Sequence, residues 1–196
     1  IGIYMSESGC PTTTLSNYTY YLGLSGTPED HAINIMNILH SISSSARIYC
    51  NAGGVLPSSE LITYISNLSF SYLPDIYFVN MSCGSFGDPN ALPGSVMDPD
   101  TGCYCLGNTC NCGDNTYNTI SKNYDDFVYN AGITVIAAAG NRGGIDGYVS
   151  NQSIGMNVLS VGNYMDVVES DYYVRYDESS FLNPNNTHSL KPEISA

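Results

Sequence analysis

The chain has 196 residues, and 18 acidic residues against five Lys and Arg give it a formal net charge of −13. No cluster of basic residues could neutralise a phosphate backbone, so nucleic acid is excluded as an expected partner, and the same charge disfavours anionic lipid. The longest apolar stretch, residues 131–139, falls far short of the roughly 20 residues that span a bilayer. With 43% hydrophobic and 12% charged residues, the composition predicts a globular protein without a membrane span.

Strands and helices alternate along the first 82 residues. Residues 1–6 form an apolar run that stops at a Gly and Pro turn, which predicts a buried strand with Glu7 at its C-terminal end. After a loop rich in Ser, Thr, Asn and Tyr, apolar residues recur at helical spacing over residues 31–40, and Asp30 is the expected N-cap. The next predicted elements are a short strand, a helix and a buried strand over residues 46–50, 60–68 and 75–82.

A segment without periodicity follows, over residues 85–114. Gly, Pro, Asn and Asp are frequent in it, and we expect a long loop insertion without regular structure. Four of the seven cysteines lie here, as Cys103-x-Cys105 and Cys110-x-Cys112. A one-residue gap rarely lets both sulfurs of a pair reach one metal ion, which makes a metal site the less favoured interpretation. Disulfides across the loop and free thiols both remain open, and so does the redox compartment.

The last part of the chain returns to alternating elements. The pattern predicts a helix, a nearly all-apolar strand that ends at Gly140-Asn141, a short strand and an edge hairpin, over residues 119–130, 132–139, 157–162 and 166–176. We therefore predict a doubly wound, mostly parallel α/β sheet with helices on both faces. Ligands of such sheets bind beyond the carboxyl ends of the strands, where Glu7, Ser82-Cys83-Gly84 and Asn141 are expected.

Three residues at the ends of predicted elements have side chains that suit acyl-transfer chemistry. Glu7 could orient a base, His31 could move a proton, and Asn141 could donate a hydrogen bond to an oxyanion. Each also has an ordinary interpretation, as a strand cap, a solvated helix terminus or a residue of a tight turn. Residue type alone is therefore weak evidence, and the order of the surrounding motifs has to decide.

Five sequence blocks follow one another in a characteristic order. They are Ile1-Gly-Ile-Tyr-Met-Ser-Glu7-Ser-Gly9, His31-Ala-Ile-Asn-Ile-Met-Asn-Ile, Val79-Asn-Met-Ser-Cys-Gly84, Gly132-Ile-Thr-Val-Ile-Ala-Ala-Ala-Gly-Asn141 and, near the end, Lys191-Pro-Glu-Ile-Ser-Ala196. Together they resemble the subtilisin-like serine peptidases, the subtilase family, over nearly the whole chain. The Ala-Ala-Ala-Gly-Asn turn is the most specific block and the His block the least, because only His31 and its apolar helix match.

The resemblance implies a serine endopeptidase that hydrolyses peptide bonds by a Ser-His-acid mechanism. In it His31 is the general base, Glu7 stands where the family has an Asp that orients the base, and Asn141 donates to the oxyanion. A peptide or protein substrate would bind as an extended strand along Ser82-Cys83-Gly84, with Ala138-Ala139-Gly140 on the other side of the primary specificity pocket. No cofactor is implied. A secreted or cell-surface location is favoured by the resemblance alone.

Two departures from the family pattern qualify this expectation. The Gly-Thr-Ser-x-Ala-x-Pro nucleophile motif does not occur, so we expect residues 1–196 to be part of one peptidase domain that its C-terminal remainder completes, and the chain alone to be inactive. Glu7 is one methylene longer than Asp, although Glu orients the base in other hydrolases. The alternative is a catalytically inactive subtilisin-like domain that binds an extended peptide or a partner chain.

Structural calcium is a further possibility that the resemblance raises. Asp98, Asp100 and Asp114 are the acidic residues that could serve, but no EF-hand pattern is present. We expect these carboxylates to be solvated and assign no metal ligand.

Overall fold

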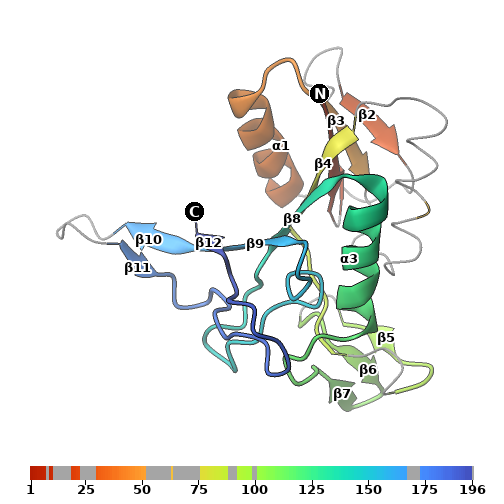
Figure 1. Cartoon of the computed structure of the whole chain (residues 1–196), viewed down its shortest axis with the longest axis vertical. Coiled ribbons are helices and arrows are strands. Elements are labelled where there is room, and N and C mark those ends of the chain that lie inside the picture. The colour runs from red at the N-terminus through yellow and green to blue at the C-terminus, as the bar shows by residue number, and fades with distance from the viewer. Residues whose placement is uncertain are drawn as a thin grey trace. The chain divides into compact units, whose positions relative to one another are not determined.

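The computed structural model describes residues 1–7, 9–10, 19–22, 30–51, 63, 76–87, 92–98, 101–166 and 173–195 (Figure 1). The chain divides into two compact units, and each is described by itself. The first comprises Ile1–Cys83 and Phe127–Val135, and the second comprises Gly84–Asp126 and Ile136–Ala196. The expectation of one peptidase domain over residues 1–196 stays a prediction.

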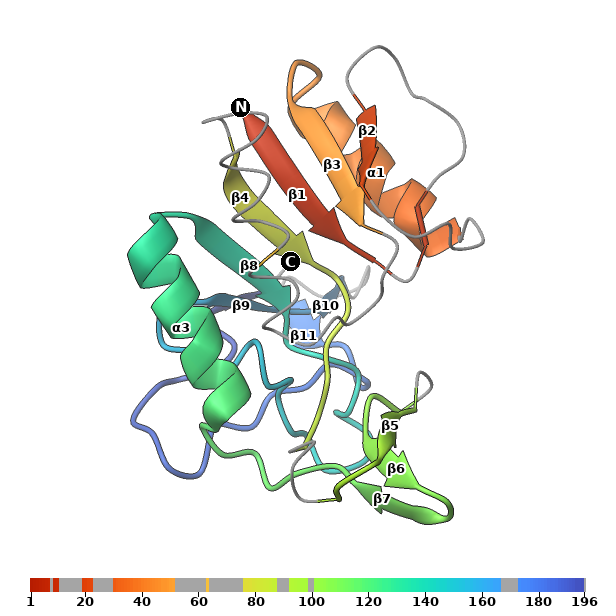
Figure 2. The same ribbon diagram turned by 90° about the vertical axis from the view of Figure 1, so that its right-hand side faces the viewer.

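Four parallel strands form the sheet of the first unit, in the order β4-β1-β3-β2 (Figure 2). They are β1 (Gly2–Ser6), β2 (Thr19–Leu22), β3 (Arg47–Asn51) and β4 (Ile76–Met81). The predictions of β1, β3 and β4 are confirmed. The segment of β2 was expected to be loop, but its Thr and Tyr residues favour extended structure, and it pairs with β3.

One helix, α1 (Asp30–Ile42), packs on this sheet. Its apolar positions, Ala32, Ile35, Met36 and Leu39, belong to a cluster with Met5, Ile48 and the cysteines Cys10 and Cys50, which form a disulfide. The predicted helical face is therefore the buried one. Asp30 lies in the first turn, where its negative charge complements the helix dipole. The helix predicted over residues 60–68 lies outside the described residues except for Thr63, which is helical.

Parallel strands also occur in the second unit. It contains Ile136–Ala138 of β8 (Thr134–Ala138), which pair with β9 (Leu159–Gly162), and β12 (Ile194–Ser195), which pairs with β9 in turn. The helix α3 (Thr119–Ala131) precedes β8. The Asn118 side chain caps α3 by accepting hydrogen bonds from the amides of Ile120 and Ser121 at 2.9 and 3.2 Å. The predictions of α3, β8 and β9 are confirmed. The antiparallel pair of β10 (Tyr164–Asp166) and β11 (Tyr173–Arg175) begins two residues before the hairpin predicted over residues 166–176.

The insertion over residues 85–114 is not the structureless loop that the sequence suggested. It contains a three-stranded antiparallel sheet of β5 (Val96–Met97), β6 (Tyr104–Leu106) and β7 (Thr109–Asn111). Cys105 lies directly opposite Cys110, and disulfides join Cys105 to Cys110 and Cys103 to Cys112. For these four cysteines the sequence allowed metal binding, disulfides or free thiols, and the structure has the disulfides. Strands this short carry too few residues to show a period in sequence.

None of the described helices has the length and apolar character needed to cross a membrane.

Candidate active site

The predicted acid and base contact each other in the first unit. Glu7 directly follows β1, and its amide donates a 3.0 Å hydrogen bond to the carbonyl of Asn51 at the end of β3. His31 lies in the first turn of α1, and its Nδ1 is 3.0 Å from Glu7 Oε2. The Glu7 side chain is 2% exposed and that of His31 is 58% exposed. A buried carboxylate therefore holds an imidazole whose outer part is accessible to solvent.

This contact defines which ring nitrogen of the neutral imidazole carries the proton. A carboxylate only accepts hydrogen bonds, so the shared proton belongs on Nδ1 and the lone pair on Nε2. Within the described part of the chain, Nε2 makes no hydrogen bond. His31 is thus oriented with an available basic nitrogen, which is the state that a general base requires.

Ser82 and Cys83, the first residues predicted to bind substrate, lie at the carboxyl end of the same sheet. Met81 at the end of β4 is opposite Ser6 of β1, so Ser82 and Cys83 leave the sheet where Glu7 does. The Cys83 thiol donates to the Ser6 carbonyl at 3.3 Å, and the Ser82 hydroxyl accepts from Asn80 Nδ2 at 2.8 Å. These contacts tie both residues to the sheet.

Cys83 is the one cysteine outside a disulfide, since the other six of the seven are paired. Burial, with a smaller effect of the Glu7 charge, raises the pKa of this thiol to about 12. The thiolate is the reactive form of cysteine, so Cys83 is a neutral and unreactive group at neutral pH.

We expect Cys83 to react with iodoacetamide at pH 8 at least about 100-fold more slowly in the folded protein than in urea, because its raised pKa leaves very little thiolate. The rate is followed by mass spectrometry of the peptide that contains Cys83. Glu7→Gln should speed the reaction of the folded protein, since it removes the negative charge near the sulfur. Equal rates in the folded and unfolded protein would contradict the assignment.

Asn141 lies in the second unit, in the turn that follows β8. Gly140 has a φ of 115°, and a Cβ on it would lie 2.6 Å from Cζ of Phe86, so both the backbone conformation and the space require glycine. The Arg142 amide donates to Ser180 Oγ at 3.1 Å, and the Ser180 amide donates to the Gly140 carbonyl at 2.9 Å. Asn141 itself is exposed, and its side chain has no hydrogen-bond partner among the described residues. Its amide is free to bind a ligand.

The other predicted substrate residues of the second unit pack against neighbouring segments. Ser150 touches two of them, because its hydroxyl donates to the Ala138 carbonyl at 3.0 Å and a Cβ on Gly84 would lie 2.6 Å from its Cβ. Ala139 is 1% exposed and packs with Val149 and Ile154. Its methyl group therefore belongs to the core, and only its backbone could line a pocket.

Sequence reasoning missed the residues that hold the Asn141 turn. Ser180 lies far from Asn141 along the chain, and no local pattern marks it as a partner. The buried Arg142 was visible only as one basic residue in a glycine-rich turn, although its i,i+4 spacing to Asp146 was a signal.

The acidic residues considered for calcium make local contacts. Asp98 accepts a hydrogen bond from the Thr101 hydroxyl at 2.8 Å and Asp114 one from the Thr116 hydroxyl at 2.5 Å, whereas Asp100 lies outside the described residues. In the described ranges, no three His, Cys, Asp or Glu residues are grouped so that they could hold a metal. We propose no metal ligand.

A comparison with protein families identifies the family of this chain. Residues 24–196 match the model of the Subtilase family. The chain belongs to the subtilase family. The matched range includes His31 and Asn141, and it begins after Glu7. The recognition from sequence is thereby confirmed, whereas the role of the acidic residue depends on the geometry described above.

Solved structures similar to this subtilase are proteases. The prenylagaramide maturation protease PagA aligns with a TM-score of 0.56 and 17% identity, over 92% of this chain and 58% of that one. A psychrophilic protease named S41 aligns with a TM-score of 0.59 and 18% identity, over 93% and 59%. The subtilisin-like protease Apa1 from Pseudoalteromonas sp. AS-11 aligns with 0.52 and 20%, over 92% and 38%. This subtilase thus has the predicted α/β fold and spans about three fifths or less of these chains. No curated protein matches it.

Proposed function

We propose that this subtilase is the front part of the catalytic domain of a serine endopeptidase, with Glu7, His31 and Asn141 in the acid, base and oxyanion roles. The single observation that carries the proposal is the 3.0 Å contact between His31 Nδ1 and the buried Glu7 carboxylate. Side chains turned apart would have favoured a domain that only binds peptides. Although Glu7 stands in an Asp position, its carboxylate reaches His31 Nδ1.

In this mechanism the nucleophilic serine lies in sequence beyond residue 196. Its Oγ attacks the peptide carbonyl carbon while His31 Nε2 takes the hydroxyl proton, and the imidazolium then gives that proton to the leaving amine as the C–N bond breaks. Water, deprotonated by the same nitrogen, then attacks the acyl carbon, and the imidazolium returns the proton to the serine Oγ as the ester bond breaks. Glu7 stabilises the imidazolium in both steps, and the Asn141 amide donates to the oxyanion of each tetrahedral intermediate.

The substrate class is taken from the family resemblance, and the position of Ser82 and Cys83 directly after β4 supports it. We propose an extended peptide as the substrate, with Ser82-Cys83-Gly84 and Ala138-Ala139-Gly140 as its binding residues. Three disulfides are typical of proteins in an oxidising compartment, which supports a secreted or cell-surface location.

The proposal is tested on the whole protein, including any sequence after residue 196. We expect it to cleave a peptide library and to be labelled by a serine-directed fluorophosphonate. Asn141→Ala should lower kcat by about 10²–10³, a magnitude known from the loss of one oxyanion donor in subtilisin, with little change in KM. Peptide binding without cleavage or labelling would show the inactive alternative, and an unchanged kcat in Asn141→Ala would remove the oxyanion role.

A further inference from the structure

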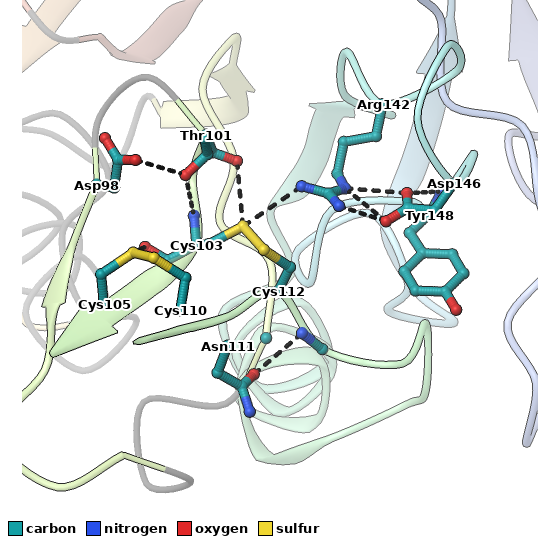
Figure 3. The surroundings of a disulfide bond; sticks show 12 residues. Asp98, Thr101, Cys103, Cys105, Cys110, Asn111, Cys112, Arg142, Asp146 and Tyr148 are labelled. Carbon is teal, nitrogen blue, oxygen red and sulfur yellow. Dashed lines mark hydrogen bonds and ion pairs between the residues drawn. A yellow bond between two sulfur atoms is a disulfide. The ribbon is translucent and has the colours of Figure 1, made fainter. Parts of the chain in front are cut away.

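A buried arginine follows the oxyanion residue in sequence and is held by residues of the second unit (Figure 3). Arg142 is 8% exposed. Its Nε donates to Asp146 Oδ1 and Oδ2 at 2.9 and 3.1 Å, and its Nη2 also binds Asp146. On its other side, Nη1 lies 3.3 Å from Sγ of Cys103. The guanidinium therefore bridges the segment after β8 and the Cys-rich insertion.

The insertion supplies two of the surfaces that enclose this guanidinium. Cys103 is fully buried and belongs to the inner disulfide, Cys103–Cys112. The Phe86 ring lies with its centroid 5.1 Å from the Arg142 guanidinium carbon, within the range of a cation–π contact. The same ring meets the backbone of Gly140 so closely that no Cβ would fit there. Phe86 is thus packed between the Arg142 side chain and the backbone that precedes Asn141.

Burying a guanidinium is costly unless its charge is compensated, and here Asp146 provides the compensation. Partial burial alone would raise the pKa of Asp146, but hydrogen bonds from Arg142 and from the Tyr148 amide, with the Arg142 charge, hold this pKa below its ordinary value. The carboxylate is therefore ionised over the whole neutral range. Asp146 therefore keeps the negative charge that pairs with Arg142 at neutral pH.

The backbone of the turn also has hydrogen-bond partners of its own. The Arg142 amide donates to Ser180 Oγ, and the Gly143 amide donates to the Glu178 carbonyl at 2.8 Å. With the Arg142 side chain held by Asp146, Phe86 and Cys103, the peptide units on both sides of Asn141 are restrained. The exposed Asn141 side chain is the part left free.

We propose that Arg142 is a positioning residue for the oxyanion donor, and that the Cys-rich insertion acts through it as a support for the Asn141 turn. This inference rests on the proposed function and deepens it. An oxyanion donor works because it is oriented before the reaction, so that no reorganisation is needed when charge develops. Small displacements of a catalytic group are costly in rate, and the Arg142 contacts prevent such displacements.

The first test compares Arg142→Met with Arg142→Lys in the whole protein. We expect Arg142→Met to lower kcat by about tenfold or more with KM within about twofold, because the oxyanion forms only after substrate has bound. Arg142→Lys keeps the charge but lacks the planar fork, so it should recover part of the loss. Rates are measured well below the melting temperature of each variant. A change confined to KM would overturn the proposal.

A double-mutant cycle separates positioning from general stabilisation. If Arg142 acts through Asn141, Arg142→Met should cost little or nothing further in kcat when Asn141 is already replaced by Ala. Fully additive losses would overturn the proposal. An Asn141→Ala variant with normal kcat, or an inert whole protein, would instead disprove the proposed function, and the positioning role of Arg142 with it.

The chain also offers a matched control for the insertion. Cys103→Ser/Cys112→Ser removes the disulfide that touches Arg142, whereas Cys105→Ser/Cys110→Ser removes the one nearer the hairpin tip. We expect only the inner pair of substitutions to lower kcat, and equal effects of both pairs would contradict the proposal. Hydrogen exchange of the Arg142 and Gly143 amides gives a readout without activity, and Arg142→Met should raise it by about tenfold or more. Unchanged exchange would show that Arg142 does not hold the turn.

Discussion

His31→Ala is expected to lower kcat of the whole protein by about 10⁴–10⁶, the largest effect of any single substitution in this chain. Without the imidazole, no group takes the proton from the attacking hydroxyl or returns it to the leaving amine. The oxyanion contact and substrate binding would remain, so KM should change little. Initial rates on a peptide substrate, with product identified by mass spectrometry, measure the loss.

The control for this prediction lies on the same helix. His40 is in the last turn of α1, and replacing it by Ala removes an imidazole without touching the Glu7 contact. We expect His40→Ala to retain activity within about twofold, as is usual for substitutions away from special features. A His31→Ala variant with more than a tenth of the wild-type kcat would exclude His31 as the base.

Glu7→Gln is expected to lower kcat by about 10³–10⁴ at neutral pH. The substitution keeps size and packing but replaces the carboxylate by an amide, whose NH₂ group can donate to Nδ1 and leave the proton on Nε2. The imidazole then holds the wrong tautomer for a base and loses the charge that stabilises its protonated form. Kinetics of the variant are compared with its thermal unfolding, because Glu7 is buried and a loss of stability must be separated from a loss of catalysis.

Glu7→Asp distinguishes the reach of the side chain from its charge. Asp withdraws the carboxylate by one methylene from a contact that is now 3.0 Å long, so we expect an intermediate loss of kcat, about tenfold. A Glu7→Asp variant more active than the wild type would mean that the backbone already suits the shorter acid. Wild-type activity in Glu7→Gln would show that Glu7 does not orient His31.

Local patterns predicted much of this structure because they depend on neighbours in sequence. The apolar stripe of α1 was readable because helical residues three and four apart share a face, and this face does pack on the sheet. The apolar run of β8 predicted a strand buried on both faces, because side chains of consecutive residues alternate between the two faces of a sheet, and the glycine after it predicted the turn. Glu7 and His31 were singled out by type and by resemblance, but their contact spans 24 residues of sequence, and only the register of β1 and the start of α1 bring them together.

The insertion shows where such reasoning fails and which signal it overlooked. Two Cys-x-Cys motifs that flank a short Gly107-Asn108 turn place their sulfurs on one face of a hairpin, because side chains alternate along strands. The disulfide between Cys10 and Cys50 had no such signal, since its partners lie 40 residues apart.

The sequence by itself determined the family, the alternating α/β elements and the residue types at the strand ends, because these depend on composition and short spacing. Only the tertiary structure decided the disulfide pairing, the orientation of His31 by Glu7, and the enclosure of Arg142 by Asp146, Phe86 and Cys103. Contacts of that kind join residues far apart in the chain. They form because folding brings charged groups and sulfur atoms from distant segments within contact distance, a condition that no local pattern encodes.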